Sequence, residues 1–156
     1  MNENEWYKIR EEVYYRDGSL RDIYVLDTTR DDWSKWIDLI NEKYSVEFYN
    51  RQTEKSEAMI NKNIVFDYFN RKTDLLNSAT ITLGKIMVKC HFFTDQEIEN
   101  DIDPGEIDTI EDHYRLISYL TDISKALSKT VVVTAENQQA IVHISVEGEN
   151  VKLNDV

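Results

Sequence analysis

The chain has 156 residues, with 18 Lys or Arg against 30 Asp or Glu, so its formal net charge is −12 at pH 7. This length predicts a single domain over residues 1–156, one cysteine excludes an internal disulfide framework, and four glycines with one proline exclude collagen-like and proline-rich chains. No apolar run approaches the ~18 residues that span a bilayer, and the N-terminus is acidic, so we expect a cytoplasmic protein with no membrane partner.

The first predicted element is a β-hairpin. Residues 7–16 alternate, with their apolar side chains on one parity, and residues 20–26 form a second β-rich run. Asp17-Gly18 lies between the two runs, and this dipeptide between two such runs is a strong hairpin signal. The sequence therefore predicts two antiparallel strands at the start of the chain.

A helix and a strand are predicted next. Thr29 and Asp32 form a capping-box-like start, and apolar residues then recur at helical spacing at Trp33, Trp36, Ile37, Ile40 and Tyr44. This spacing is typical of a face buried in the core. Residues 46–49 predict the strand that follows. Residues 57–70 fit a helix, which we expect, although Ile64-Val65-Phe66 also suits a strand.

Residues 79–83 and 86–93 predict two strands joined by a tight turn at Gly84-Lys85. In the second strand Cys90 lies on the apolar parity, which predicts a buried thiol, whereas His91 lies on the other parity.

A second capping-box-like pair, Thr109 and Asp112, predicts a helix that ends near Leu127. Residues 130–134 and 141–146 predict two closing strands, and the tail from about residue 151 is expected to fray. The predicted order is ββαβαββαββ. Hairpins dominate this order, so it predicts an α+β fold of two layers: a largely antiparallel sheet with helices packed on one face.

Residues 95–112 carry nine acids and no Lys or Arg, and so supply −9 of the net charge of −12. The same segment contains four isoleucines, which predict an acidic loop that is pinned onto the core. Like charges without a counter-charge favour the binding of a cation or a basic partner. A run of acidic residues is also typical of a solvated loop. The candidate partner-binding residues are Asp95, Glu97, Glu99, Asp101, Asp103, Glu106 and Asp108.

Known catalytic patterns are absent from the sequence. The four glycines are widely separated, which excludes glycine-rich phosphate-binding loops, and there is no Gly-x-Ser-x-Gly, His-Glu-x-x-His or Cys-x-x-Cys motif. A calcium-loop pattern that starts at Asp101 fails because Gly105 falls at its fifth position. We therefore assign no catalytic residue, no metal ligand and no cofactor. Nucleic acid is disfavoured as a partner because a chain of charge −12 repels phosphates.

Three stretches together resemble a set of small acidic bacterial proteins of uncharacterised activity. They are the opening Trp6-Tyr7 to Asp27 region with its Arg16-Asp17-Gly18-Ser19-Leu20-Arg21-Asp22-Ile23-Tyr24-Val25 core, the Asp32-Trp33 helix start, and Cys90-His91-Phe92-Phe93-Thr94. This resemblance implies no established activity. In size, acidity and α+β character the chain is also similar to immunity proteins of bacterial toxin systems, which implies a binding role.

These observations predict a non-catalytic protein-binding module, of immunity type, that neutralises a basic toxin through an acidic surface. One alternative is an enzyme that depends on a divalent metal held by the same carboxylates. Another is an assembly subunit that buries Trp33 and Trp36 against a partner.

Overall fold

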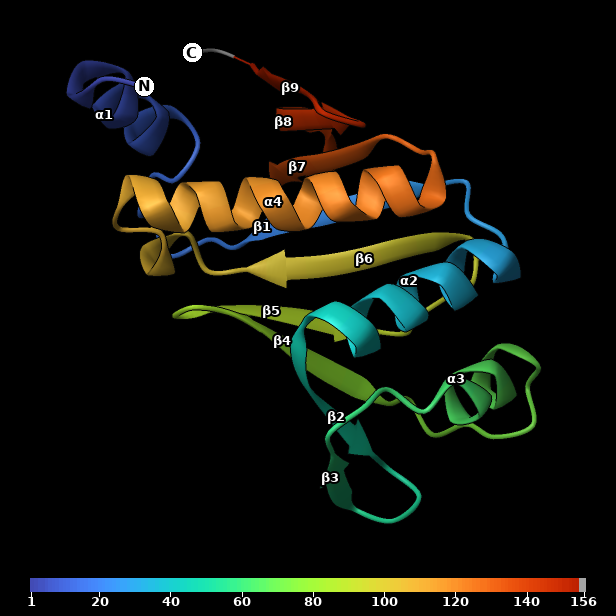
Figure 1. Cartoon of the computed structure of the whole chain (residues 1–156). Helices are drawn as coiled ribbons and strands as arrows, with labels where there is room; N and C mark the ends of the chain where they lie inside the picture. Colours follow the sequence, from blue (N-terminus) through green and yellow to red (C-terminus); the bar gives the residue numbers. More distant parts are fainter. Residues whose placement is uncertain (155–156) are drawn as a thin grey trace.

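Within the described residues, nine strands form one sheet in which every pairing is antiparallel. The computed structural model describes residues 1–154. The strand order across the sheet is β3-β2-β4-β5-β6-β1-β7-β8-β9 (Figure 1). In chain order the elements are α1 (Glu3–Glu12), β1 (Arg21–Leu26), α2 (Arg30–Lys43), β2 (Ser45–Asn50), β3 (Lys55–Glu57), α3 (Lys62–Phe69), β4 (Ser78–Leu83), β5 (Ile86–His91), β6 (Glu97–Ile102), the 3₁₀ turn η1 (Pro104–Glu106), α4 (Ile110–Leu127), β7 (Val131–Ala135), β8 (Gln138–Glu147) and β9 (Asn150–Leu153).

Helices α2 and α4 lie side by side on one face of the sheet, which confirms the α+β architecture (Figure 1). Their apolar stripes pack onto strand residues to form one core that includes side chains from Trp6 to Val146. Trp33 and Trp36 are fully buried and contact the ring of Phe92. The predicted stripe of α2 is therefore core, and this face of the helix is closed to an assembly partner.

Both predicted capping boxes are present. The side chain of Thr29 accepts from the backbone N–H of Asp32 at the start of α2, and Thr109 does the same with Asp112 at the start of α4. Each aspartate in turn accepts from the backbone N–H of its threonine. These pairs satisfy N–H groups that a helix start otherwise leaves open, which explains why both helices begin where the sequence predicts.

The predicted opening hairpin is wrong, because its first half forms α1. Asn2 and Glu5 form a capping box there, and the buried residues Trp6, Ile9 and Val13 follow helical spacing rather than alternation. The turn after α1 is held instead by the buried guanidinium of Arg21, which donates to the carbonyl oxygens of Val13 (2.8 Å) and Tyr15 (2.7 Å). Only the second predicted strand, β1, exists.

Two further boundaries differ from the prediction. The helix expected over residues 57–70 is confined to α3, because Lys55–Glu57 pairs with β2 as the edge strand β3. The tail expected to fray from residue 151 instead forms β9, which pairs with β8 through residue 153. Residues 155–156 lie outside the described part of the chain. The observed order is therefore longer than the predicted ββαβαββαββ and opens with a helix.

The acidic segment is not a loop in its first half. Residues 97–102 form β6, which lies near the middle of the sheet between β5 and β1. Ile98 and Ile102 are buried as expected, and Ile107 is buried after the 3₁₀ turn. The isoleucines alternate with the acids at strand spacing, so the same pattern that fixes the segment to the core also directs its carboxylates to the opposite face.

Candidate functional site: an acidic sheet face

Strands β1 and β6 place their side chains alternately on the two faces of the sheet. In β6, Ile98, Asn100 and Ile102 are buried on the helix side, where Asn100 accepts a hydrogen bond from the hydroxyl of Tyr119 on α4 (2.6 Å). The intervening residues of β6, and the matching residues of β1, face away from α2 and α4. We call this surface the open acidic face; its residues are Asp22, Tyr24, Glu97, Glu99 and Asp101.

Cross-strand pairing sets like charges against one another on the open acidic face. Asp22 lies directly opposite Asp101, and Tyr24 lies directly opposite Glu99. Like charges at opposed positions of an antiparallel pair destabilise a sheet. Across residues 1–154, none of the four carboxylates on this face forms an ion pair. The face therefore carries an electrostatic cost that no ion pair within the described residues relieves, although Lys89 lies opposite Asp101 on the β5 side and offsets part of it.

Hydrogen bonds fix the positions of three of these acids, namely Asp22, Glu97 and Glu99. The carboxylate of Asp22 is buried, and it accepts from the backbone N–H of Asn137 (2.7 Å) and from the hydroxyl of Tyr24 (3.2 Å). The same hydroxyl lies 3.3 Å from Oε1 of Glu99. Gln139 in β8 donates to Glu97 (3.2 Å). The carboxylates are thus held by the sheet and by the β7–β8 hairpin rather than by flexible chain.

The environment of the face favours protonated carboxyl groups. Burial raises the pKa of Glu99 above its ordinary value, and the charges of Asp22 and Glu97 raise it further. Burial also raises the pKa of Asp101, although the nearby charges of His91 and Lys89 oppose this shift. Both directions indicate that the ionised face is destabilised in the free protein, so a bound cation would relieve it.

Only three of the seven predicted partner-binding residues lie on this face. Asp95 precedes β6 and forms an ion pair with Arg30 (2.8 Å). Asp108 is paired with both Arg16 and Lys85. These two carboxylates are already neutralised by bases from other elements, which overturns their assignment to a single exposed surface.

The side chains of the remaining two predicted residues accept hydrogen bonds from backbone N–H groups. Asp103 caps the 3₁₀ turn by accepting from the N–H of Gly105 (2.8 Å), and Glu106 accepts from the N–H of Met87 (3.2 Å). Both positions follow β6 and lie outside its row of acids. The predicted patch is therefore divided: Glu97, Glu99 and Asp101 share one face, and the other four residues do not join them.

The sequence reasoning missed Asp22 and Tyr24. Both residues fall in a predicted strand. The acidic segment, however, was predicted as a loop, so the sequence did not indicate that its acids lie on the same sheet face as Asp22 and Tyr24. Glu136, in the β7–β8 turn, is a further acid near the face: its charge contributes to the raised pKa of Asp101. The sequence did contain a signal that singles out Asp22: this charged residue lies in the same strand as the apolar and aromatic run Ile23-Tyr24-Val25-Leu26 and directly precedes it.

Exposed apolar side chains lie beside the acids. Leu26, opposite Glu97 at the end of β1, is 42% exposed, and Met87 on β5 is 43% exposed. Phe93 is 50% exposed, and one side of its ring stacks on the imidazole of His91 with centroids 5.3 Å apart. The face thus combines fixed negative charge with several apolar contact points.

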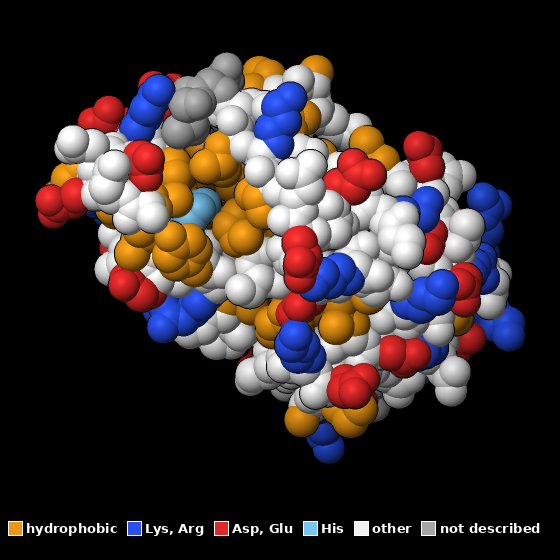
Figure 2. Space-filling model, turned by 45° about the horizontal axis from the view of Figure 1, so that its top comes forward, with side chains coloured by type: hydrophobic (Ala, Val, Ile, Leu, Met, Phe, Trp, Pro, Cys, Tyr) orange, Lys and Arg blue, Asp and Glu red, His pale blue; other side chains and the backbone are white. Residues whose placement is uncertain are grey.

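The helix side of the molecule has a different charge pattern. Figure 2 shows acidic and basic side chains interspersed over the surface that bears the helices, without a large region of one sign. Several of the opposite charges there are paired, such as Lys35 with Asp31 and Lys62 with Asp38. The unpaired carboxylates of the open acidic face are therefore not a general property of this acidic chain.

Groups with catalytic potential are buried or isolated. Burial raises the pKa of the Cys90 thiol, so the reactive thiolate is disfavoured. His113 on α4 is buried beside Trp6 of α1, where burial lowers its pKa to about 4 and Nδ1 lies 2.7 Å from the hydroxyl of Tyr14. In the part of the chain that the structure covers, no three His, Cys, Asp or Glu side chains are grouped so that they could hold a metal ion.

Comparison with known proteins adds no assignment: no protein-family profile, no curated protein and no solved structure matches the chain. Among the described helices, none has the length and apolar character needed to cross a membrane. The function must therefore be inferred from the geometry of the chain itself.

Proposed function

We propose that this protein is a non-catalytic binding module that docks a basic protein partner on the open acidic face. The observation that carries the proposal is the direct opposition of Asp22 and Asp101 on neighbouring strands, where neither carboxylate forms an ion pair within the described chain. A fold that retains such a cost gains stability when a partner supplies the missing positive charge.

The geometry of the face suits recognition of arginine or lysine side chains. The carboxylates lie on a rigid sheet and are oriented by hydrogen bonds, so little ordering is needed when a partner binds. A concentrated negative potential steers a basic partner to the face and accelerates association. Leu26, Met87 and Phe93 supply apolar contacts at its margin, where aromatic and apolar anchors add affinity.

Within this class, an immunity protein is the role that we favour. A toxin that cleaves nucleic acid must be positive where it holds phosphates, and a fixed acidic face is complementary to such a cleft. The similarity in size, acidity and α+β make-up to immunity proteins of bacterial toxin systems supports the same role.

Titration with an arginine-rich peptide tests the binding part of the proposal. The triple variant Glu97→Gln, Glu99→Gln, Asp101→Asn should weaken binding by at least about tenfold and flatten its dependence on salt. The matched control Glu3→Gln, Glu11→Gln, Glu12→Gln removes the same charge from exposed positions of α1 and should change affinity by less than about twofold. Equal losses in the two triple variants would mean that the peptide senses only net charge.

The immunity role has its own test. The chain is expressed in bacteria together with the reading frame that adjoins its gene, and growth is compared between the native chain and the triple variant. We expect the native chain to restore growth and the triple variant to fail. If the adjoining product is harmless alone, the immunity role is wrong, whereas the peptide titration still decides whether the face binds basic ligands.

A further inference from the structure

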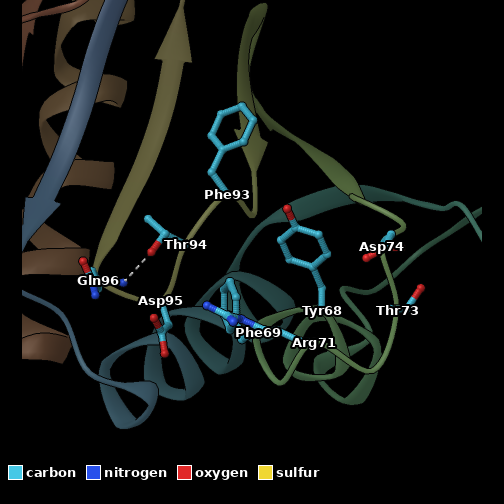
Figure 3. A pocket seen from close by; sticks show the side chains of 9 residues that line it. All are labelled: Tyr68, Phe69, Arg71, Thr73, Asp74, Phe93, Thr94, Asp95 and Gln96. Carbon is cyan, nitrogen blue, oxygen red and sulfur yellow. Dashed lines mark hydrogen bonds between the residues drawn. The ribbon is translucent and has the colours of Figure 1, made fainter.

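A cavity of about 440 Å³ lies between the end of α3, the loop that follows it, and the β5–β6 connection. Tyr68 on α3 and Phe93 on the connection both line this cavity, and both rings point toward the same side in Figure 3, away from the Arg71 side chain. Stacking on His91 fixes the orientation of the Phe93 ring. Two aromatic side chains therefore line one cavity and are available to a further ring.

Arg71 is an unpaired cation in the lining of this cavity. Its neighbour Arg30 is paired, since Nε donates to Asp95 (2.8 Å) and Nη1 donates to Asn70 (2.5 Å). Within residues 1–154, the guanidinium of Arg71 has no hydrogen bond, ion pair or ring contact. Figure 3 shows its side chain running toward Asp95, whose charge Arg30 already balances. This side of the cavity thus has one positive charge in excess.

Arg71 has a left-handed backbone conformation, which glycine adopts with less strain than arginine. Arg71 has φ +60° and follows α3, where the N–H of Arg71 donates to the carbonyl oxygen of Tyr68 and the N–H of Lys72 donates to that of Asp67. This pair of hydrogen bonds is a Schellman motif, and its left-handed position is usually occupied by glycine because other side chains are strained there. The chain therefore accepts backbone strain to place a guanidinium at the cavity.

We propose that the cavity binds a small aromatic anion. The guanidinium of Arg71 holds its carboxylate or phosphate group through charge-assisted hydrogen bonds, and its ring lies against Tyr68 and Phe93. Asp74 lies on the opposite side of Tyr68 from the Arg71 guanidinium (Figure 3), and its carboxylate is also unpaired among the described residues. That charge repels an anion, so the acidic group of the ligand points toward Arg71. The cavity shares Phe93 with the margin of the open acidic face, but Tyr68, Arg71 and Asp74 belong to the cavity alone.

Phenyl phosphate, benzoate and inorganic phosphate are the probes, followed by NMR shifts of the native chain. Phenyl phosphate should bind with a dissociation constant of about 1 mM or tighter, and at least about tenfold more tightly than inorganic phosphate, with shifts at Thr94 and Gln96. Benzoate distinguishes a carboxylate from a phosphate preference. Saturable binding of either aromatic probe at these residues supports the proposal, and no saturation by about 10 mM overturns it.

Variants separate the two contacts. Arg71→Gly should weaken phenyl phosphate binding at least about tenfold while leaving the melting temperature unchanged or higher, because glycine suits the backbone there. Arg71→Gln should weaken binding similarly without altering the strain. Phe93→Ala should reduce affinity for phenyl phosphate but not for inorganic phosphate.

The adjacent Lys72→Ala is the matched control, since Lys72 is exposed, carries the same charge and does not line the cavity. It should change affinity by less than about twofold. Undiminished binding in both Arg71 variants, or an equal loss in the Lys72 variant, would overturn the assignment. Asp74→Asn should tighten binding, and a weakening there would show that the acidic group is not directed toward Arg71.

Discussion

The open acidic face predicts that removing charge stabilises the free protein. The double variant Glu99→Gln, Asp101→Asn keeps the shapes of both side chains, and the glutamine introduced in place of Glu99 retains an oxygen that can accept from the Tyr24 hydroxyl. Asp101→Asn removes the like-charge interaction with Asp22 directly opposite, and Glu99→Gln removes those with Asp22 and Glu97. Each is worth roughly 0.2–1 kcal/mol, reduced by solvent screening at these half-buried positions. We expect the free energy of unfolding to rise by about 1 kcal/mol at pH 7, which shifts a urea midpoint by about 0.5 M without a change in slope.

The gain should depend on pH. Because the pKa values of Glu99 and Asp101 are raised in the folded state, the folded native chain binds more protons than the unfolded chain as the pH falls toward their ordinary values of 4.5 and 3.8. The stability contributed by these two groups therefore increases as the pH falls through that window. The advantage of the variant should be complete at pH 7, shrink through the raised pKa values, and vanish below about pH 3.8.

Urea unfolding of the native chain and the double variant at about pH 7 and about pH 3.5 measures both effects. Glu149→Gln is the control, because the hydrogen bond from Lys125 lowers the pKa of Glu149 and its loss should not stabilise the protein at neutral pH. A double variant that is no more stable than the native chain at neutral pH would refute the reasoning. So would a gain of the same size at both pH values, which would point to packing rather than charge.

A helix cap and two buried side chains lead to three further expectations. Thr109→Ala removes the N-cap of α4 and should lower the free energy of unfolding by about 1 kcal/mol in urea titrations. Arg21→Lys should cost about 3 kcal/mol in the same assay, because an ammonium cannot replace the forked hydrogen bonds to the carbonyls of Val13 and Tyr15. In NMR titrations the His113 imidazole should stay neutral down to about pH 4; its contribution to stability is complete above pH 6.5 and is lost as the pH falls toward 4, whereas titration near 6.5 would contradict its burial.

Elements with local signals were predictable from sequence. Helices α2 and α4 each combine a capping box with an apolar stripe, so cap and periodicity indicate the same boundaries. The β4–β5 hairpin was equally clear, because its two alternating runs meet at Gly84 with φ +62°. In these cases the decisive interactions lie within a few residues of one another, and pattern reasoning therefore succeeds.

The sequence predictions failed where a contact between residues distant in sequence determines the secondary structure. Residues 7–15 contain apolar side chains that satisfy both alternation and helical spacing, and the burial of Trp6 against His113 of α4 selects the helix. Residues 97–102 carry too many acids for an ordinary strand, yet pairing with β1 and β5 on both sides makes them one. The candidate site inherited this error, because the acid opposite Asp101 is distant in sequence and becomes its neighbour only through the sheet.

The position of β1 in the sheet constrains how the chain acquires its structure. This strand is formed by residues 21–26, but its two neighbours, β6 and β7, come from residues 97–102 and 131–135. A strand made early during synthesis must therefore wait for most of the chain before either of its edges is covered. Such long sequence separations slow folding and leave a nascent apolar strand open to misassociation. We expect refolding to be slow for a protein of this size, and the emerging chain to benefit from a chaperone on the ribosome.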